Sequence, residues 1–313
     1  MSVTSLPVSL KPDTIVDEDV ERENLNAVEN FETYRSYLFS IAYRMLGSVM
    51  DAEDMVQEAY LRYQSASYET IHSLKAYLTT IMTRLCIDQL HLSYKQRETY
   101  IGPWLPEPII TENTATPNAE EATVMQESLS VAFLCLLEQL QPMERAVFLL
   151  REVFDYDYAD IATFVGRKEV ACRQLFSRAK KHLANSQRHD VVPPEVHKQL
   201  LESFLRAVQA GDQTALMELL TEDVRLVADG GGKIPGAATQ AVVGSRAVAQ
   251  FAIGVNLRFL PSVYHIELSE VNYQPAAIAR SDGKALVVMT VEVEEGRMKM
   301  IRFMANPDKL AHL

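Results

Sequence analysis

Residues 50–63 read Met50-Asp51-Ala52-Glu53-Asp54-Met55-Val56-Gln57-Glu58-Ala59-Tyr60-Leu61-Arg62-Tyr63. Apolar side chains, among them Ala52 and Val56, recur at helical spacing and predict one buried face. Asp51, Asp54 and Glu58 form an acidic stripe on another face of the same helix. Acidic residues in a first turn also complement the helix dipole. The stripe therefore has two interpretations, a stabilised helix start or a contact with a basic partner.

The same helical periodicity extends outward from this stretch, from Phe31 to about Tyr94, with one early glycine, Gly47. Prolines then interrupt the pattern, a second helical block follows, and Pro193-Pro194 marks another boundary. We predict a disordered acidic N-terminus (1–28), a helical domain (29–101), a linker (102–123), a second helical domain (124–187), a short linker (188–194) and a C-terminal domain (195–313).

The C-terminal domain has a different sequence pattern. Two helical stretches, 195–210 and 213–221, precede segments of alternating character at 224–228, 285–294 and 298–304. Turn signals such as Ser281-Asp282-Gly283-Lys284 and Glu295-Gly296 separate the later segments. The order predicts an α+β domain with an antiparallel sheet.

Charge is distributed unevenly in this chain of 313 residues, whose net charge is −12. Residues 1–28 carry two basic and six acidic side chains, whereas residues 167–188 carry seven basic side chains against Glu169 alone. A compact basic element in an acidic protein predicts a nucleic-acid contact limited to one surface.

Other chemistries find little support in the sequence. No apolar run approaches the ~20 residues that span a bilayer, and the start lacks the features of a signal peptide, so we expect no membrane contact and a cytoplasmic location. Cys86, Cys135 and Cys172 lie far apart and read as small buried residues in a reducing compartment. We expect no cofactor, and the histidines show no metal-binding spacing.

A helix-turn-helix is predicted near the middle of the chain. Tyr158–Val165 has the buried stripe of a short helix, Gly166 permits the turn, and the helix after it buries Cys172 and Ala179. Arginine and glutamine on such a helix can read base edges, and lysine can reach phosphates. The exposed face that we expect to contact DNA consists of Lys168, Arg173, Gln174, Ser177, Arg178 and Lys181.

Two of these segments resemble those of extracytoplasmic-function sigma factors. Residues 42–47 (Ala-Tyr-Arg-Met-Leu-Gly) and the helix that follows resemble region 2, and the resemblance implies that this helix binds the clamp of the RNA polymerase β′ subunit. The polymerase contacts would be Asp51, Asp54, Gln57 and Glu58. Arg178-Ala179 matches the characteristic pair of region 4, which reads the minus-thirty-five promoter element and lies near the β flap.

The segment 74–97 resembles the family's helix for the minus-ten element. A melted promoter needs a pocket for an unstacked base and basic contacts to the strand. The candidates are Arg84, Asp88, His91, Lys95 and Arg97. The family usually has several arginines directly after the aspartate, whereas Gln89, His91 and Tyr94 interrupt the pattern here. Asp88 could also simply pair with Arg84 one turn earlier.

Three short motifs resemble the marks of one sigma subfamily, whose members carry a C-terminal SnoaL-like domain of the NTF2-like fold. They are Trp104-Leu105-Pro106-Glu107-Pro108, Asp229-Gly230-Gly231-Gly232-Lys233 and Asn306-Pro307-Asp308-Lys309-Leu310. The resemblance implies a multidomain chain of two all-α sigma domains and an α+β cone that regulates them in cis. We expect the second and third motifs to contact the first. Alternatively, the glycines form a tight turn and Asn306-Pro307 ends a strand.

Two other classes of function stay open at this stage. The chain could be a helix-turn-helix regulator that senses a ligand without polymerase, or an enzyme with an accessory helical part. Asp229 and His265 are the obvious acid–base candidates in an NTF2-like pocket. No second clear catalytic group accompanies them, so we expect no enzymatic activity and expect a small-molecule ligand, if there is one, in the C-terminal domain.

Overall fold

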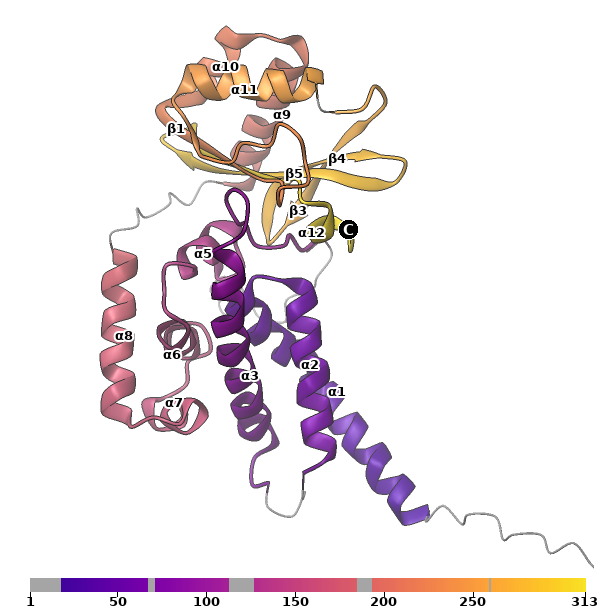
Figure 1. The fold of residues 1–313 in the computed structure, drawn as a ribbon, viewed down its shortest axis with the longest axis vertical. Coiled ribbons are helices and arrows are strands. Elements are labelled where there is room, and N and C mark those ends of the chain that lie inside the picture. The colour runs from indigo at the N-terminus through magenta and orange to yellow at the C-terminus, as the bar shows by residue number, and fades with distance from the viewer. Residues whose placement is uncertain (1–17, 67–70, 113–126, 185–192, 259) are drawn as a thin grey trace, which may run out of the picture.

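The computed structural model describes residues 18–66, 71–112, 127–184, 193–258 and 260–313. Two helical domains lie below an α+β domain (Figure 1). The first contains α1 (Glu18–Leu46), α2 (Val49–Gln64) and α3 (Leu74–Arg97). The second contains α5 (Val131–Leu137), α6 (Pro142–Glu152), α7 (Tyr158–Val165) and α8 (Glu169–Ala184). Among the described residues, no helix is both long and apolar enough to cross a bilayer.

Helix α1 begins earlier than the sequence pattern predicted. Its first turns, from Glu18 to Val28, belong to the segment 1–28 that we expected to be disordered, and that part of the prediction is wrong. The sequence of these turns is rich in charged residues and has few apolar ones, which is why periodicity did not predict a helix there. Glu and Arg are nevertheless good helix formers, and acidic residues suit a helix start. Residues 1–17 lie outside the described residues.

Local capping explains the junction between α1 and α2. Gly47 ends α1 with a φ of +68°, a conformation that favours glycine. Ser48 then caps α2, and its hydroxyl accepts a hydrogen bond from the Asp51 N–H at 3.1 Å. The buried face of α2 holds Ala52 and Val56, as its spacing predicted.

The helix-turn-helix forms where it was expected. Asp157 caps α7, and Gly166 (φ +65°, ψ +40°) ends it in the left-handed conformation before α8 starts. Cys172 and Ala179 are the buried positions of α8. The turn chemistry and the apolar spacing are both local, so the sequence alone was enough to predict this motif.

The two helical domains share one hydrophobic core. Met82 of α3 and Phe164 of α7 belong to the same cluster of buried side chains. The hydroxyls of Tyr37 and Tyr156 are 2.5 Å apart, and the ring of Tyr156 meets Phe164 edge to face. In this arrangement α3 therefore lies directly against the helix-turn-helix.

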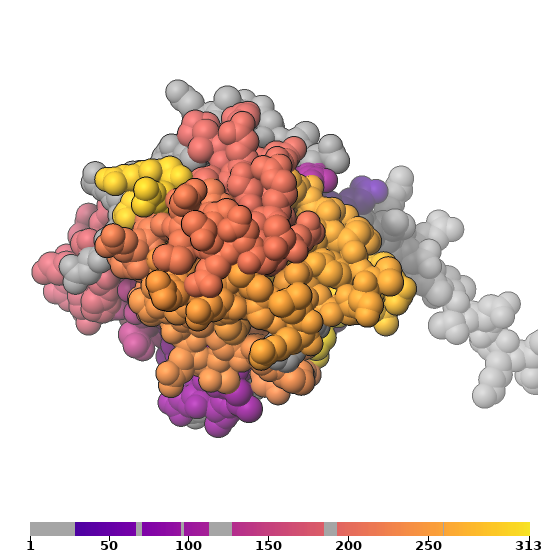
Figure 2. All heavy atoms as spheres, turned by 90° about the horizontal axis from the view of Figure 1, so that it is seen from above, coloured from indigo at the N-terminus to yellow at the C-terminus, as the bar shows by residue number. Residues whose placement is uncertain are grey.

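The C-terminal domain wraps a curved sheet around three helices. It contains α9 (Pro194–Ala210), α10 (Gln213–Leu219), β1 (Leu220–Asp229), β2 (Val242–Val243), α11 (Ser245–Arg258), β3 (His265–Val271), β4 (Gln274–Ser281), β5 (Lys284–Glu294), β6 (Arg297–Met304) and α12 (Pro307–Leu310). The strand order is β2-β1-β6-β5-β4-β3. Seen from above, this domain fills the centre of the view and the helical domains emerge around its rim (Figure 2).

The sheet is mixed rather than antiparallel throughout. Strands β3 to β6 pair in antiparallel fashion, but β1 pairs in parallel with β6, so the prediction is wrong for that pair. A parallel pair needs a long crossover, which α11 and the intervening strands provide. The sequence pattern also missed α11 and β4. Gly254 weakens the helical signal of α11, and Pro275 with three alanines weakens the strand signal of β4.

Both faces of the sheet are covered. The helices α9, α10 and α11 pack on one face, where Leu201, Phe204 and Val248 share a core with the strands. A second core forms on the opposite face, where Leu105 of the linker packs with Ile278 and Leu310. The linker is therefore part of the C-terminal domain's packing, and this places the three sequence motifs side by side.

Candidate functional site

Asp229 ends β1 inside the contact between the linker and the C-terminal domain. Its side chain is fully buried and accepts four hydrogen bonds. The donors are the Tyr100 hydroxyl at 2.5 Å, the Leu105 N–H at 2.8 Å, the Lys309 ammonium at 2.7 Å and the Gly231 N–H at 3.1 Å. We call Tyr100, Trp104, Leu105, Asp229 and Lys309 the Asp229 cluster. Its residues come from three distant parts of the sequence.

Lys309 joins the cluster from the short helix α12. Its ammonium also donates to the Leu105 carbonyl at 2.5 Å and lies 4.0 Å from the centre of the Trp104 ring. Burial lowers the pKa of Lys309 to about 8, although the Asp229 carboxylate opposes that change. A buried ion pair with this many partners favours one arrangement of the linker over others.

Within the cluster, Trp104 lies between Arg97 of the first helical domain and Lys309. The guanidinium of Arg97 stacks 3.6 Å from its ring centre, on the ring that also contacts Lys309. The edge of the Trp104 ring fills the space beside Gly47, where an added methyl group would come within 2.8 Å of the ring. The same glycine therefore ends α1 and makes room for Trp104.

The three glycines after Asp229 allow close approach. A methyl group at Gly231 would meet the Asn306 amide at 2.4 Å, and one at Gly232 would meet Ile101 at 2.9 Å. Gly231 and Gly232 also have positive φ. Both alternatives from the sequence therefore apply, because the triplet is a tight turn and a contact surface at once.

Asn306 connects the last motif to the linker. Its amide donates to the Tyr100 hydroxyl at 2.9 Å, and its side-chain oxygen caps α12 by accepting from the Asp308 N–H. Pro307, at the first position of α12, is exposed. Lys233 and Asp308 pair at 2.5 Å on the surface, outside the buried cluster.

Glu107 faces the opposite way, toward α2. Its carboxylate accepts hydrogen bonds from the Ser48 hydroxyl at 2.9 Å and from the Val49 N–H at 2.6 Å. Its own N–H donates to the Gly47 carbonyl at 2.8 Å. Pro106 lies beside Gly47, and the Pro108 carbonyl contacts the His312 ring at 2.8 Å. The linker thus binds the start of α2 with one side and the C-terminal domain with the other.

Asn272 is a contact that the sequence analysis missed. It sits at the β3–β4 turn with a φ of +52°. Its side-chain oxygen accepts from the Ile109 N–H at 3.0 Å, and its amide donates to the Tyr43 hydroxyl and the Leu129 carbonyl, both at 2.8 Å. Asparagine is common in turns, so the only sequence signal had an ordinary local explanation.

The four residues predicted to contact polymerase lie on α2. Asp54 and Gln57 are exposed, and Glu58 pairs with Arg62 at 2.9 Å. Asp51 is half-buried and accepts a hydrogen bond from Gln89 at 3.3 Å. The acidic face of α2 is therefore open to solvent at Asp54 and Gln57. Ser48 and Glu107 both cap the start of this helix.

The residues predicted to contact the minus-ten element are not brought together. Arg84 donates to the Phe164 carbonyl at 3.0 Å and to the Thr163 carbonyl at 3.1 Å, both at the end of α7, rather than reaching toward Asp88. Arg97 is engaged with Trp104 and forms an ion pair with Glu138. Asp88 and His91 are exposed, while the side chain of Lys95 lies outside the described residues.

The basic face of α8, by contrast, is open to solvent. Lys168, Arg173, Gln174, Ser177, Arg178 and Lys181 are all exposed. Arg173 lies 4.3 Å from the centre of the Tyr158 ring, and Arg178 approaches Glu144 at 3.8 Å. These contacts orient the two guanidinium groups without covering them.

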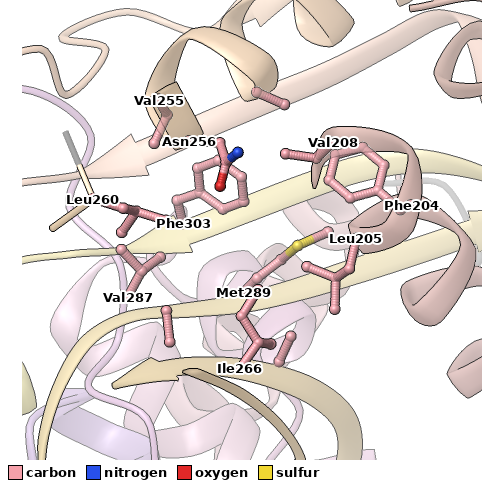
Figure 3. A pocket seen from close by; sticks show the side chains of 13 residues that line it. Phe204, Leu205, Val208, Val255, Asn256, Leu260, Ile266, Val287, Met289 and Phe303 are labelled. Atoms are coloured by element: carbon pink, nitrogen blue, oxygen red, sulfur yellow. The ribbon is translucent and has the colours of Figure 1, made fainter. Parts of the chain in front are cut away.

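Asp229 and His265 do not form an acid–base pair around a cavity. Asp229 is enclosed by the cluster, and His265 is exposed at the first position of β3. A cavity of about 70 Å³ lies inside the cone (Figure 3). None of the described residues that line it has a titratable side chain. The arrangement therefore offers a binding cavity without an acid or a base.

Comparisons with known proteins fit this architecture. The family model for Sigma-70 region 2 matches residues 31–97, and that for Sigma-70, region 4 matches residues 130–183. The ECF RNA polymerase sigma factor SigJ of Mycobacterium tuberculosis is 37% identical over 291 residues, which cover 90% of this chain and 92% of the relative. The probable sigma factor SigI of the same species is 29% identical over 283 residues, which cover 90% and 93%.

A solved structure extends the likeness to all three domains. The crystal structure of the M. tuberculosis extracytoplasmic function sigma factor SigJ matches with a TM-score of 0.70 and 35% identity, covering 91% of this chain and 98% of that one. The match includes the helical domains and the α+β domain, whose helices and curved sheet have the NTF2-like architecture. The chain therefore belongs to the extracytoplasmic-function sigma factors of RNA polymerase and carries an NTF2-like domain after its two sigma domains.

Proposed function

We propose that the C-terminal domain holds this sigma factor in a closed arrangement through the Asp229 cluster, and that promoter recognition requires the arrangement to open. In the open form α2 binds the clamp of the polymerase β′ subunit through Asp51, Asp54, Gln57 and Glu58. Region 4 lies near the β flap with α8 on the minus-thirty-five element, and α3 binds the minus-ten element. The proposed location is the cytoplasm, where the polymerase acts, and the proposed role of the third domain is regulatory rather than enzymatic.

The contact between α3 and α7 carries this proposal. Arg84 of α3 donates to two carbonyls at the end of α7, and the two helices share one core. The positions that name the minus-ten and minus-thirty-five elements are about 25 base pairs apart. This spacing corresponds to roughly 85 Å of duplex at ~3.4 Å per base pair. Helices in direct contact cannot reach both elements, so the two sigma domains must separate on a promoter.

The linker is the segment that can control this separation. It contacts region 2 through Glu107 and Trp104, and the C-terminal domain through Leu105. Asn272 of the C-terminal domain accepts from the Ile109 N–H of the linker and donates to the Leu129 carbonyl, so it connects the linker with the start of the second helical domain. Each contact is satisfied in the closed arrangement. Opening the domains requires some of these hydrogen bonds to break, so interactions within the Asp229 cluster favour the closed form.

Glu107 supports a second role for the linker, at the polymerase-binding helix. Its carboxylate accepts from two N–H groups at the start of α2, Val49 and Met50. A negative charge at a helix start stabilises the helix by about 0.3–1 kcal/mol when exposed and up to ~2 kcal/mol when partly buried. The linker would therefore keep α2 in place for polymerase while it restrains the domains.

Run-off transcription with core RNA polymerase, from the promoter upstream of the chain's own gene, tests the proposal. Specific transcripts should disappear when Asp51, Asp54 and Glu58 are all changed to Ala. Tyr100→Phe removes the hydroxyl that donates to Asp229 and accepts from Asn306, so it should raise transcription at limiting sigma concentration. A chain truncated after Asn185 should do the same.

Two outcomes would overturn the proposal. Loss of polymerase binding by the full chain and by residues 1–190 would remove the polymerase contact. Unchanged transcription in both Tyr100→Phe and the truncated chain would remove the regulatory role of the cluster. Ser203→Ala, on α9 and away from the linker, provides a control for nonspecific effects of substitution.

A further inference from the structure

The NTF2-like domain contains two neighbouring cavities with apolar walls. One has a volume of about 70 Å³ and the other about 140 Å³, and both are lined by Val255, Leu260, Val287 and Phe303. Figure 3 shows side chains from α9 and α11 and from the sheet converging on the smaller cavity. Because the two cavities share these walls, a side-chain rotation at Phe303 is enough to alter both.

The walls define the chemistry of an occupant. None of the described residues lining either cavity is charged, and Asn256 supplies the polar side chain of the smaller one, where its oxygen accepts from the Tyr264 hydroxyl. A charged ligand would lose its hydration without gaining a partner. An apolar protein cavity of ~150 Å³ is large enough to bind benzene. The walls therefore suit an uncharged, largely apolar molecule about the size of a six-membered ring.

The larger cavity is lined in part by sequence neighbours of the second and third motifs. Its lining includes Ala228, the segment 234–237 and Ala305, which directly precede or follow Asp229, Lys233 and Asn306 in the sequence. A methyl group at Gly230 would come within 2.6 Å of the Ala237 side chain. The loop 229–237 therefore has one side on the cavity and the other on the linker, with no free space between its two limbs at Gly230.

We propose that the NTF2-like domain binds an uncharged apolar molecule in these cavities, and that occupancy strengthens the closed arrangement through the loop 229–237. The proposal rests on the proposed role of the Asp229 cluster. The cavity exists in the closed arrangement and the loop forms part of its wall. A ligand that fills it binds this arrangement more tightly than one in which the loop has moved, and so shifts the population toward the closed form.

Trp104 provides a direct readout, because it is the single tryptophan of the chain and belongs to the cluster. Cyclohexanol is a suitable probe, and cyclohexanecarboxylate is its charged counterpart of the same ring size. We expect millimolar cyclohexanol to lower the acrylamide quenching constant of Trp104 in the full-length protein at least twofold. Cyclohexanecarboxylate should leave the constant unchanged.

Variants separate the cavity from the surface. Val255→Phe fills space shared by both cavities and should abolish the cyclohexanol effect. Val243→Phe makes the same change at an exposed position of β2 outside the cavity walls and should keep it. Because coupling is reciprocal, Tyr100→Phe, which lies outside the NTF2-like domain, should weaken cyclohexanol binding about threefold or more in calorimetry.

The outcomes distinguish this inference from the proposed function. If cyclohexanol does not bind, or binds without changing Trp104 quenching, the ligand proposal fails even when Tyr100→Phe still raises transcription. An equal effect of cyclohexanecarboxylate would also overturn it, because the walls would then not select uncharged molecules. If Tyr100→Phe changes neither transcription nor Trp104 quenching, the role of the Asp229 cluster fails first.

Discussion

The charged side chains of α8 and those of the Asp229 cluster lie in opposite environments. Arg173 and Arg178 keep 58% and 60% of their side-chain area exposed, whereas Lys309 keeps 8% and Asp229 none. Exposed charges cost little to maintain and remain available to a polyanion. Buried charges must be paired with good geometry, so they favour one arrangement of the chain. Similar residue types therefore stay available to a partner in one region and are committed to contacts between domains in the other.

The largest effect should come from removing one partner of the buried pair. Asp229→Ala leaves the Lys309 ammonium buried without its carboxylate, which typically costs about 3–5 kcal/mol. Urea unfolding followed by Trp104 fluorescence and circular dichroism should show this loss in the free energy of unfolding. A change below about 1 kcal/mol would mean that the pair does not hold the domains together.

The pKa of Lys309 tests the same difference between buried and exposed charges. Burial lowers this pKa to about 8 from the usual 10.5, so the unfolded chain binds more protons between these two pH values. The contribution of Lys309 to the free energy of unfolding should therefore increase as pH rises from about 8 to 10.5. Carbon-13 NMR of the lysine side chains should show one lysine titrating near pH 8, and Asp229→Asn should lower its pKa further. A Lys309 resonance that titrates with the exposed lysines would contradict burial of the charge.

On α8 the expected effect is on binding rather than on stability. Arg178→Ala should weaken binding to minus-thirty-five DNA by about 1–3 kcal/mol if the side chain contacts a base, and its free energy of unfolding should stay within about 0.5 kcal/mol of wild type. Fluorescence anisotropy with a labelled duplex measures the affinity. Arg206→Ala, which removes an exposed arginine from α9, is the matched control and should bind as wild type. Equal losses in both variants would indicate a general charge effect.

The smallest effect is expected at the surface pair beside the cluster. Lys233 and Asp308 keep 52% and 63% of their side-chain area exposed. Asp308→Asn should change the free energy of unfolding by no more than about 0.5 kcal/mol, because such pairs are well solvated. The same urea titration that measures Asp229→Ala provides the value. A loss comparable to that of Asp229→Ala would show that burial is not what separates the two pairs.

Local signals made much of the fold predictable. The helix α2, the helix-turn-helix around Gly166 and the strands β5 and β6 follow from spacing, caps and turn residues that act over a few positions. The parallel β1–β6 pair and the strand β4 were not predictable in this way. Their stability comes from neighbours on both faces of the sheet rather than from the propensity of their own residues.

The residues of the candidate site also differ in how far the sequence predicts them. The three motifs could be selected because they resemble the marks of a sigma subfamily, and the basic face of α8 because it is a short pattern of charged residues on one side of a helix. Arg84 and Arg97 mark the limit of such patterns, because the sequence predicts DNA contacts for both, whereas in this structure both are engaged with other parts of the chain. Asn272 was missed because an asparagine at a turn already has a local explanation.

The amino-acid sequence is enough to assign the family, the domain order and the residue types available for polymerase and DNA. The folded structure is needed to know which charges are buried, which arginines are engaged, and that the linker covers one face of the NTF2-like sheet. The physical reason is that burial and pairing depend on contacts between residues far apart in the chain. Tyr100 and Asp229 are 129 positions apart, and no local pattern encodes their 2.5 Å hydrogen bond.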